Sequence, residues 1–259
     1  MTTDMHQSPD NPAESTVARN PPDSAAGGPA GQRRHLYLVG LLAFTSGCGD
    51  VVALLALGGA FTSVITGNLI FIGRAAGTES LSPAVHAVIA VLGYMAGVLV
   101  GAVVIRVLER AKTPSAPWPL RATAVFAVEG AILVAVNAVW FGYGTHPPAS
   151  AQDALLVAVA AALGMQGAGA RAIEGTPSTT YMTGALTSLV SSLATGQRHK
   201  TDASAAVGLV GLVAGAGLCA ALVLHVRWAA LLPPLITLAL VVGLKARHHL
   251  DEARAANAE

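Results

Sequence analysis

The chain has 259 residues, of which 53% are hydrophobic and only 11% are charged. Since soluble domains carry about 25% charged residues, this composition argues against a soluble protein. The net charge of +1 provides no basic field for a nucleic-acid backbone, so DNA and RNA are not expected as partners. Cys48 and Cys219 stand in apolar runs without His or Cys neighbours at metal spacing, and they predict neither a disulfide framework nor a zinc site.

Residues 1–31 are polar and rich in Pro, Ser, Gly and Asp, without an apolar period. Such a segment cannot bury enough apolar surface to offset the entropy of ordering, so we expect a disordered cytoplasmic tail. Beyond it come stretches long enough to cross the hydrocarbon layer, which takes about 20 helical residues. These six stretches lie at 36–57, 84–108, 121–142, 152–170, 203–226 and 228–246.

Two further apolar segments, 61–77 and 178–196, are shorter and rich in Thr, Ser and Gly. If both crossed the membrane there would be eight crossings, and six of the fifteen Lys and Arg residues would lie outside. If both are re-entrant half-helices, six crossings remain and only Arg74 and Arg227 lie outside. Because cytoplasmic loops carry the excess of Lys and Arg, the sequence favours six crossings with both termini cytoplasmic, and eight spans are the alternative. The loop 143–151, which lacks Lys and Arg, is then external.

An internal repeat accompanies this topology. A shift of 117 residues superposes Thr66, Gly67 and Leu69 on Thr183, Gly184 and Leu186, and Gly47 on Gly164. Each half then consists of a span, a half-helix and two more spans, and an odd number of crossings inverts the second half, as in many secondary transporters. We expect an all-α membrane domain with a first repeat at 32–143, a second at 152–247 and a cytoplasmic tail at 248–259.

Helix-breaking residues precede both half-helices, at Gly58-Gly59-Ala60 and at Glu174-Gly175-Thr176-Pro177. Irregular backbone at membrane depth is tolerated only where protein or a water-filled cavity satisfies its polar groups. Hydroxyl residues at 62–63 and 178–180 follow the breaks and are expected to cap the new helix N-termini. Two N-termini at the bilayer centre would attract an anion, a carboxylate or a carbonyl oxygen. Ordinary short loops between full spans are the alternative.

The half-helices supply most of the candidate solute-binding residues. Thr66, Gly67, Thr183 and Gly184 occupy equivalent repeat positions, and we expect them close together near the membrane centre. Asn68 and Gln166 complete the set of candidate solute-binding residues, and an interhelical hydrogen bond is the alternative role of Asn68.

Two carboxylic acids lie inside the predicted spans, Asp50 in the first and Glu129 in the third. A charge at the bilayer centre costs about 2.5 kcal/mol or more, so both side chains should face the bundle interior, protonated or paired. Either residue is a candidate for relaying a proton or coupling transport to a cation. The alternative is a carboxylic acid that only hydrogen-bonds a neighbouring helix.

Two blocks of the sequence carry a family resemblance: GCGDVVALLALGGAFTSVITGNLIFIG and GMQGAGARAIEGTPSTTYMTGALTSL. They resemble the YoaK-type family of bacterial inner-membrane proteins (domain of unknown function 1275). The chain matches the pattern of that family at Gly47, Asp50, Gly59, Thr66, Gly67, Asn68, Gly164, Gln166, Thr180, Thr183, Gly184 and Leu186. It departs at Val51 and Gly167, where the family usually has Ala and Asn. The resemblance covers roughly residues 35–247 and implies a polytopic membrane protein, without supplying a substrate or reaction.

The sequence contains no nucleophile elbow, phosphate-binding loop, dinucleotide-binding motif or metalloprotease signature, so we expect no enzyme, cofactor or metal site. We expect a multi-pass protein of the bacterial inner membrane, in contact with the lipid bilayer, that acts as a secondary transporter or permease for a small solute. A channel-like pore and a non-transporting scaffold or sensor are the alternatives. No oligomeric state follows from the sequence.

Overall fold

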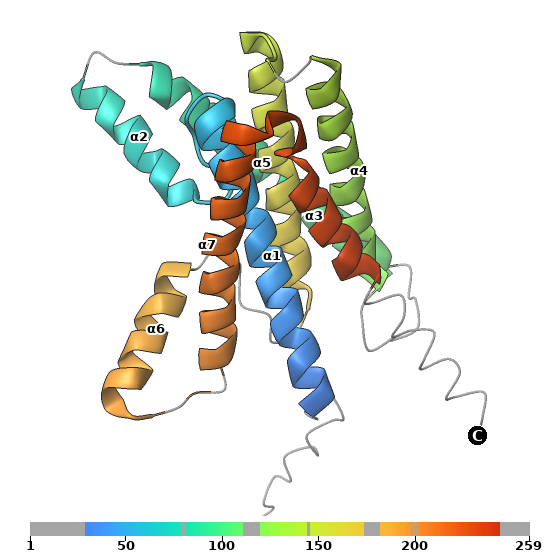
Figure 1. Ribbon diagram of the computed structural model, residues 1–259. Helices are drawn as coiled ribbons and strands as arrows, with labels where there is room; N and C mark the ends of the chain where they lie inside the picture. Colours follow the sequence, from blue (N-terminus) through green and yellow to red (C-terminus); the bar gives the residue numbers. More distant parts are fainter. Residues whose placement is uncertain are drawn as a thin grey trace, which may run out of the picture.

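The computed structural model describes residues 29–78, 81–110, 120–143, 146–173, 182–197, 199 and 201–243, and within these the chain forms helices and no strand. In chain order (Figure 1), the helices are α1 (Pro29–Ala56), α2 (Ile65–Gly77), α3 (Ser82–Arg110), α4 (Leu120–Gly142), α5 (Ala149–Arg171), α6 (Met182–Thr195) and α7 (Asp202–His225). A 3₁₀ turn at Arg227–Ala229 and a helix through residues 232–243 follow α7.

Five of these helices, α1, α3, α4, α5 and α7, are long and apolar enough to cross a membrane, with a mean hydropathy between 1.5 and 2.6. They coincide with the first five apolar stretches predicted from the sequence. The sixth stretch corresponds to a shorter apolar helix, Arg227–Gly243, in the described part of the chain. In its described part the chain is therefore all-helical, with five helices of a length and composition suited to crossing a membrane.

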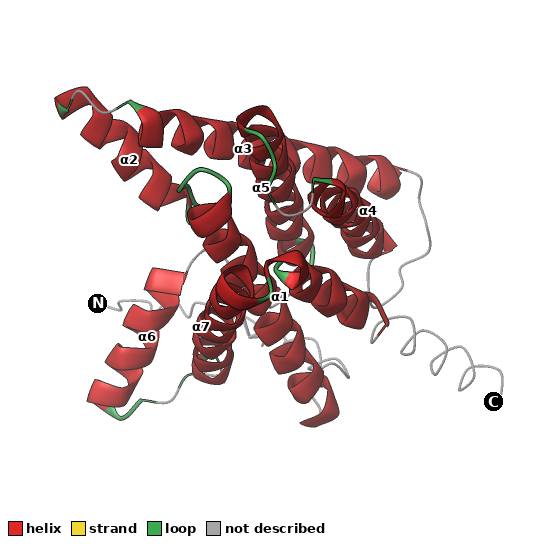
Figure 2. Cartoon of the chain, turned by 45° about the horizontal axis from the view of Figure 1, so that its top comes forward, coloured by secondary structure: helices red, strands yellow, loops and turns green. Residues whose placement is uncertain are grey.

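The short helices α2 and α6 lie outside the bundle that the long helices form (Figure 2). α2 packs against α3, and α6 packs against α7. Both begin at mid-height of the bundle and run outward, α2 toward one end and α6 toward the other (Figure 1). The first residues of the two helices, Ile65 and Met182, are 117 positions apart.

Glycines bring α1 and α7 into backbone contact. A Cβ atom on Gly47 would overlap the carbonyl oxygen of Leu212, and one on Gly215 would overlap the carbonyl oxygen of Phe44. Gly211 lies against the backbone of Gly40 in the same way. From the contact 40–211 to the contact 44–215 the residue numbers of both helices increase, so α1 and α7 are parallel. Since lipid is as apolar as the helices themselves, close packing of this kind is what holds membrane helices together.

The same contacts recur between α3 and α5. A Cβ atom on Gly97 would overlap the carbonyl group of Ala161, and one on Gly164 would overlap the carbonyl oxygen of Tyr94. The contact residues of the two pairs are related by a nearly constant shift along the chain. Residues 44 and 47 of α1 correspond to residues 161 and 164 of α5, which lie 117 positions later. Residues 94 and 97 of α3 correspond to residues 212 and 215 of α7, which lie 118 positions later. The two parallel helix pairs therefore share one contact register.

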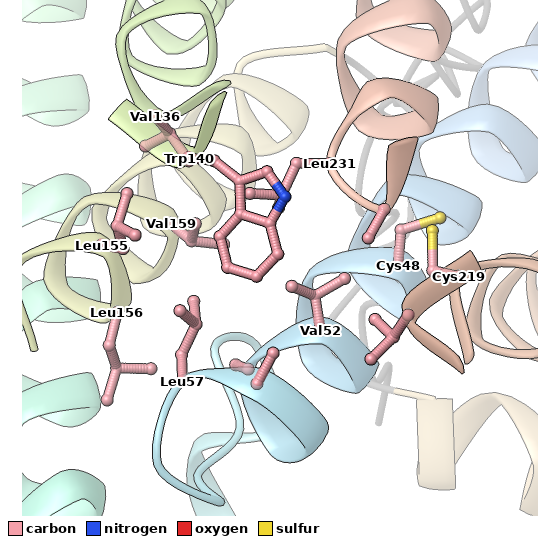
Figure 3. Packing of buried hydrophobic residues seen from close by; sticks show 14 of the residues in the cluster. Cys48, Val52, Leu57, Val136, Trp140, Leu155, Leu156, Val159, Cys219 and Leu231 are labelled. Carbon is pink, nitrogen blue, oxygen red and sulfur yellow. The ribbon is translucent and has the colours of Figure 1, made fainter. Parts of the chain in front are cut away.

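A buried apolar cluster joins α1, α4, α5 and α7 around the indole of Trp140 (Figure 3). The indole nitrogen donates to the carbonyl oxygen of Arg227 at 3.1 Å. The Asn137 side chain donates to the carbonyl oxygen of Leu231, also at 3.1 Å, so α4 is bonded to the chain that follows α7. Cys48 and Cys219 lie in this cluster as buried free thiols.

Several expectations from the sequence fall outside the described residues. These include most of the predicted N-terminal tail, the C-terminal tail, the second break at 174–177 and its hydroxyl residues at 178–180. α1 begins at Pro29, inside the predicted tail, and its last residue, Ala56, lies just before the first predicted break.

Candidate functional site

The break between α1 and α2 occurs where the sequence predicts it. Gly58 and Gly59 have φ angles of +103° and +83°, a region that residues with a side chain rarely adopt. The imidazole ring of His86, from the first turns of α3, lies directly against Gly58, and a Cβ atom there would overlap the ring. The break is therefore a tight turn closed by α3.

The carboxylate of Asp50 holds the chain beyond this turn. Its Oδ1 atom accepts the backbone N–H groups of Thr62 at 2.7 Å and Ser63 at 2.6 Å, and the Thr62 hydroxyl at 3.1 Å. Its Oδ2 atom accepts the Ser63 hydroxyl at 2.6 Å. Asp50 is only 7% exposed, so one buried side chain satisfies four donors of the break.

The predicted capping role of Thr62 and Ser63 is wrong. The residue that precedes α2 is Val64, and no side chain caps this helix by a hydrogen bond. Both hydroxyls donate to the carboxyl oxygens of Asp50 instead, at 3.1 Å and 2.6 Å.

Asn68 closes the break from its other side. The backbone N–H of Phe61 donates to the Asn68 Oδ1 atom at 2.9 Å, and the Asn68 Nδ2 atom donates to the carbonyl oxygen of Phe61 at 2.6 Å. Asn68 is fully buried, so its amide bonds to the irregular backbone here. The missing side chain of Gly67 leaves room for the Phe61 ring, because a Cβ atom at position 67 would lie only 3.0 Å from that ring.

A second polar cluster lies inside the bundle and joins α1, α5 and α4. The Ser46 hydroxyl donates to the Gln166 Oε1 atom at 3.1 Å, and the Gln166 Nε2 atom donates to the Glu129 Oε1 atom at 3.2 Å. Gln166 and Glu129 are fully buried, and Ser46 is 1% exposed. The Glu129 Oε2 atom has no hydrogen-bond partner, and no basic side chain pairs with Glu129 among the described residues.

The two polar clusters occupy neighbouring turns of α1. Ser46 and Asp50 are four residues apart, which places them on one face of the helix. Gly49 faces α5 between them, where a Cβ atom would lie 3.1 Å from the Thr62 hydroxyl oxygen and 2.7 Å from the Leu163 side chain. Ser46 was not predicted from the sequence, although its position one turn before Asp50 could have indicated it.

The remaining candidate solute-binding residues lie at the starts of the two short helices. Thr66 is exposed and Gly67 is partly buried on α2, and Thr183 and Gly184 have the same exposure on α6. The expectation that these four residues lie close together stays a prediction.

A polar stripe along α6 was also not predicted from the sequence. Thr183, Thr187, Ser191 and Thr195 recur every fourth residue, and all four are exposed. The hydroxyls of Thr187 and Thr195 each donate at 2.9 Å to the carbonyl oxygen four residues earlier. α6 packs on α7, and Ser192 is its buried residue. The spacing of four residues is the signal in the sequence that would have revealed this stripe.

Comparison with known proteins places the chain in a family. The family described as "Protein of unknown function (DUF1275)" matches residues 38–244. The "UPF0700 transmembrane protein YoaK" of Bacillus subtilis (strain 168) is 30% identical over 155 residues, which are 59% of this chain. The match spans 64% of that protein, less than two thirds of its length. No solved structure matches the chain. The resemblance found in the two sequence motifs is thus confirmed, and the chain belongs to the DUF1275 family.

Proposed function

We propose that the protein is a secondary transporter for a small solute, coupled to protons through Glu129. The observation that carries this proposal is the state of the Glu129 carboxyl group. It is fully buried, its Oε2 atom has no hydrogen-bond partner, and no described basic side chain forms an ion pair with it. An unpaired carboxylate is very costly in such surroundings, so this carboxyl group carries a proton here. To lose the proton, it must gain water or a new partner.

The arrangement of the helices supports an inverted repeat. The shared contact register of the α1–α7 and α3–α5 pairs and the equivalent starts of α2 and α6 are what two related halves would produce. Inverted repeats in transporters place the substrate site at the interface between the halves. Glu129 belongs to the first predicted half and Gln166 to the second, so their hydrogen bond crosses that interface.

The contacts divide the candidate residues between two roles. Asp50 and Asn68 bond to the backbone of the break, which leaves them little capacity for a solute. Gln166 bonds Glu129 directly, so a solute that displaces the Gln166 amide would change the environment of the proton. Thr66 and Thr183 are exposed hydroxyls at the starts of the half-helices. We therefore assign proton coupling to Glu129 and solute contact to Gln166, Thr66 and Thr183.

The polar stripe on α6 fits a water-filled path. Lipid offers hydroxyl groups no hydrogen-bond partners, so a row of four exposed hydroxyls favours a surface that water or a solute reaches. Thr187 and Thr195 donate to their own helix, and their oxygen atoms still offer acceptor sites to water or solute.

The test compares Glu129→Gln with wild type after the solute is found by comparing metabolite uptake in deletion and complemented cells. In vesicles, a pH difference of one unit supports about tenfold accumulation of a solute that moves with one proton. We expect the variant to lose this accumulation and to keep solute exchange without a gradient. The matched control is Glu109→Gln, which removes an exposed carboxylate from α3.

If the Glu129→Gln variant accumulated the solute to the same level as wild type, coupling through Glu129 would be refuted. Loss of both accumulation and exchange in a folded variant would assign Glu129 to solute binding instead. A wild-type protein that equilibrates the solute but never concentrates it would favour the channel-like pore.

The topology is tested by single-cysteine labelling after replacement of Cys48 and Cys219 by Ala. With six crossings, a membrane-impermeant reagent added from outside labels a cysteine at position 74 but not at 112 or 200. Labelling of position 112 from outside would overturn the six-crossing arrangement and favour eight spans.

A further inference from the structure

The structure contains a cavity of about 320 Å³ between α3 and α5 that the proposed function does not use. Its walls include Tyr94, Val98 and Leu99 from α3 and Gly167 and Arg171 from α5. We propose that this cavity binds one anionic phospholipid, with an acyl chain against the apolar wall and the phosphate group at Arg171. This inference does not depend on whether the protein transports a solute.

Gly167 lines the cavity without a side chain of its own. A Cβ atom on Gly167 would lie 3.0 Å from the phenol oxygen of Tyr94, so a larger side chain would extend into the space between the helices. The helices themselves are fixed close by, where Gly164 contacts the backbone of Tyr94.

The apolar wall faces outward. Met95 and Leu99 line the cavity and are 53% and 64% exposed, so the cavity opens on the periphery of the bundle. In a membrane protein this surface meets acyl chains. A volume of about 320 Å³ lies within the range of roughly 300–1,000 Å³ that is usual for small-molecule sites.

One cation stands at the end of this apolar wall. Arg171 occupies the last turn of α5, is exposed, and forms no ion pair with any described acidic residue. Exposed Arg106 and Arg110 lie in the last turns of the parallel helix α3, at the same end of the bundle. The favoured topology makes this the cytoplasmic end, where basic pockets between membrane helices bind anionic head groups.

The chemistry of the walls selects the occupant. A guanidinium group pairs well with a phosphate, because its N–H groups match two phosphate oxygens. A soluble anion would leave the apolar wall unused, whereas a zwitterionic lipid would bring its own cation near Arg171. An anionic phospholipid satisfies both the apolar wall and the charge.

Native mass spectrometry of the full chain with defined lipids tests this site. Phosphatidylglycerol and phosphatidylcholine with identical acyl chains serve as probes. We expect wild type to retain one phosphatidylglycerol about fivefold more than phosphatidylcholine, because one Arg near the surface contributes about that factor. Arg171→Gln should abolish this preference. Leu99→Trp, which fills the cavity from its exposed side, should reduce retention of both lipids.

The matched control is Arg74→Gln, which removes an exposed cation from α2, away from the cavity. It should keep the wild-type preference. An unchanged preference in Arg171→Gln, or an equal loss in Arg74→Gln, would overturn the proposal, and so would full retention of lipid by Leu99→Trp. Displacement of bound phosphatidylglycerol by inorganic phosphate at an equal concentration would also overturn the proposal, because the site would then recognise the anion alone.

Discussion

Replacement of Gly215 by Leu is expected to prevent α1 and α7 from packing, so that little folded protein is recovered from the membrane. A Cβ atom at this position already overlaps the backbone of Phe44, which cannot move aside as a side chain could. Overpacking usually costs about 1–3 kcal/mol, and a clash with backbone should lie at or above the upper end of this range. The measurement is the amount of monodisperse protein in detergent and its melting temperature.

The matched control is Gly217→Leu on the same helix, since a Cβ atom on Gly217 has no neighbour within 4 Å. This variant should give a yield and melting temperature close to wild type. Equal stability of the two variants would show that the glycine contact between α1 and α7 does not hold the bundle together. Gly97→Leu should repeat the Gly215→Leu result in the α3–α5 pair, where the same contact recurs.

Replacement of Asp50 by Ala is expected to release the break between α1 and α2. Two buried backbone N–H groups and two hydroxyls lose their acceptor, and each buried donor left unsatisfied costs about 1–3 kcal/mol. The total destabilisation should reach about 3 kcal/mol or more, even if the hydroxyls rotate to other acceptors. Melting temperature reports the loss, and hydrogen exchange at the amides of Thr62 and Ser63 reports its location.

Asp50→Asn should be milder, because its side-chain oxygen can still accept the two backbone N–H groups. Glu109→Ala is the matched control, since it removes an exposed carboxylate from the last turns of α3, far along the helix from His86. If Asp50→Ala and Glu109→Ala had equal melting temperatures and equal exchange at residues 62 and 63, the hydrogen bonds of Asp50 would not be what holds the break.

The positions of the helices follow closely from the sequence. Uninterrupted apolar length predicts α1, α3, α4, α5 and α7, because a hydrocarbon layer of fixed thickness selects for it. The glycine pair at 58–59 predicts the first break, since only glycine adopts its φ angles without strain. These features depend on local composition alone.

The contacts of the site follow much less from the sequence. Asp50 was identifiable as an unusual residue in a span, but its partners depend on how the chain folds back beyond Gly59. Thr62 and Ser63 carry a capping pattern, and the nearby carboxylate takes their hydroxyls instead. The parallel pairing of α1 with α7 was not predictable, because small residues occur on several spans and none specifies its partner.

That pairing imposes an order on biogenesis. α1 ends at Ala56 and α7 begins at Asp202, so at about 5–20 residues per second α1 waits roughly 7–30 s for the ribosome to deliver its partner. Ser63, by contrast, emerges within a few seconds of Asp50 at such rates. The first hairpin can therefore satisfy the carboxyl oxygens of Asp50 by local hydrogen bonds long before the helix that packs against α1 has been made.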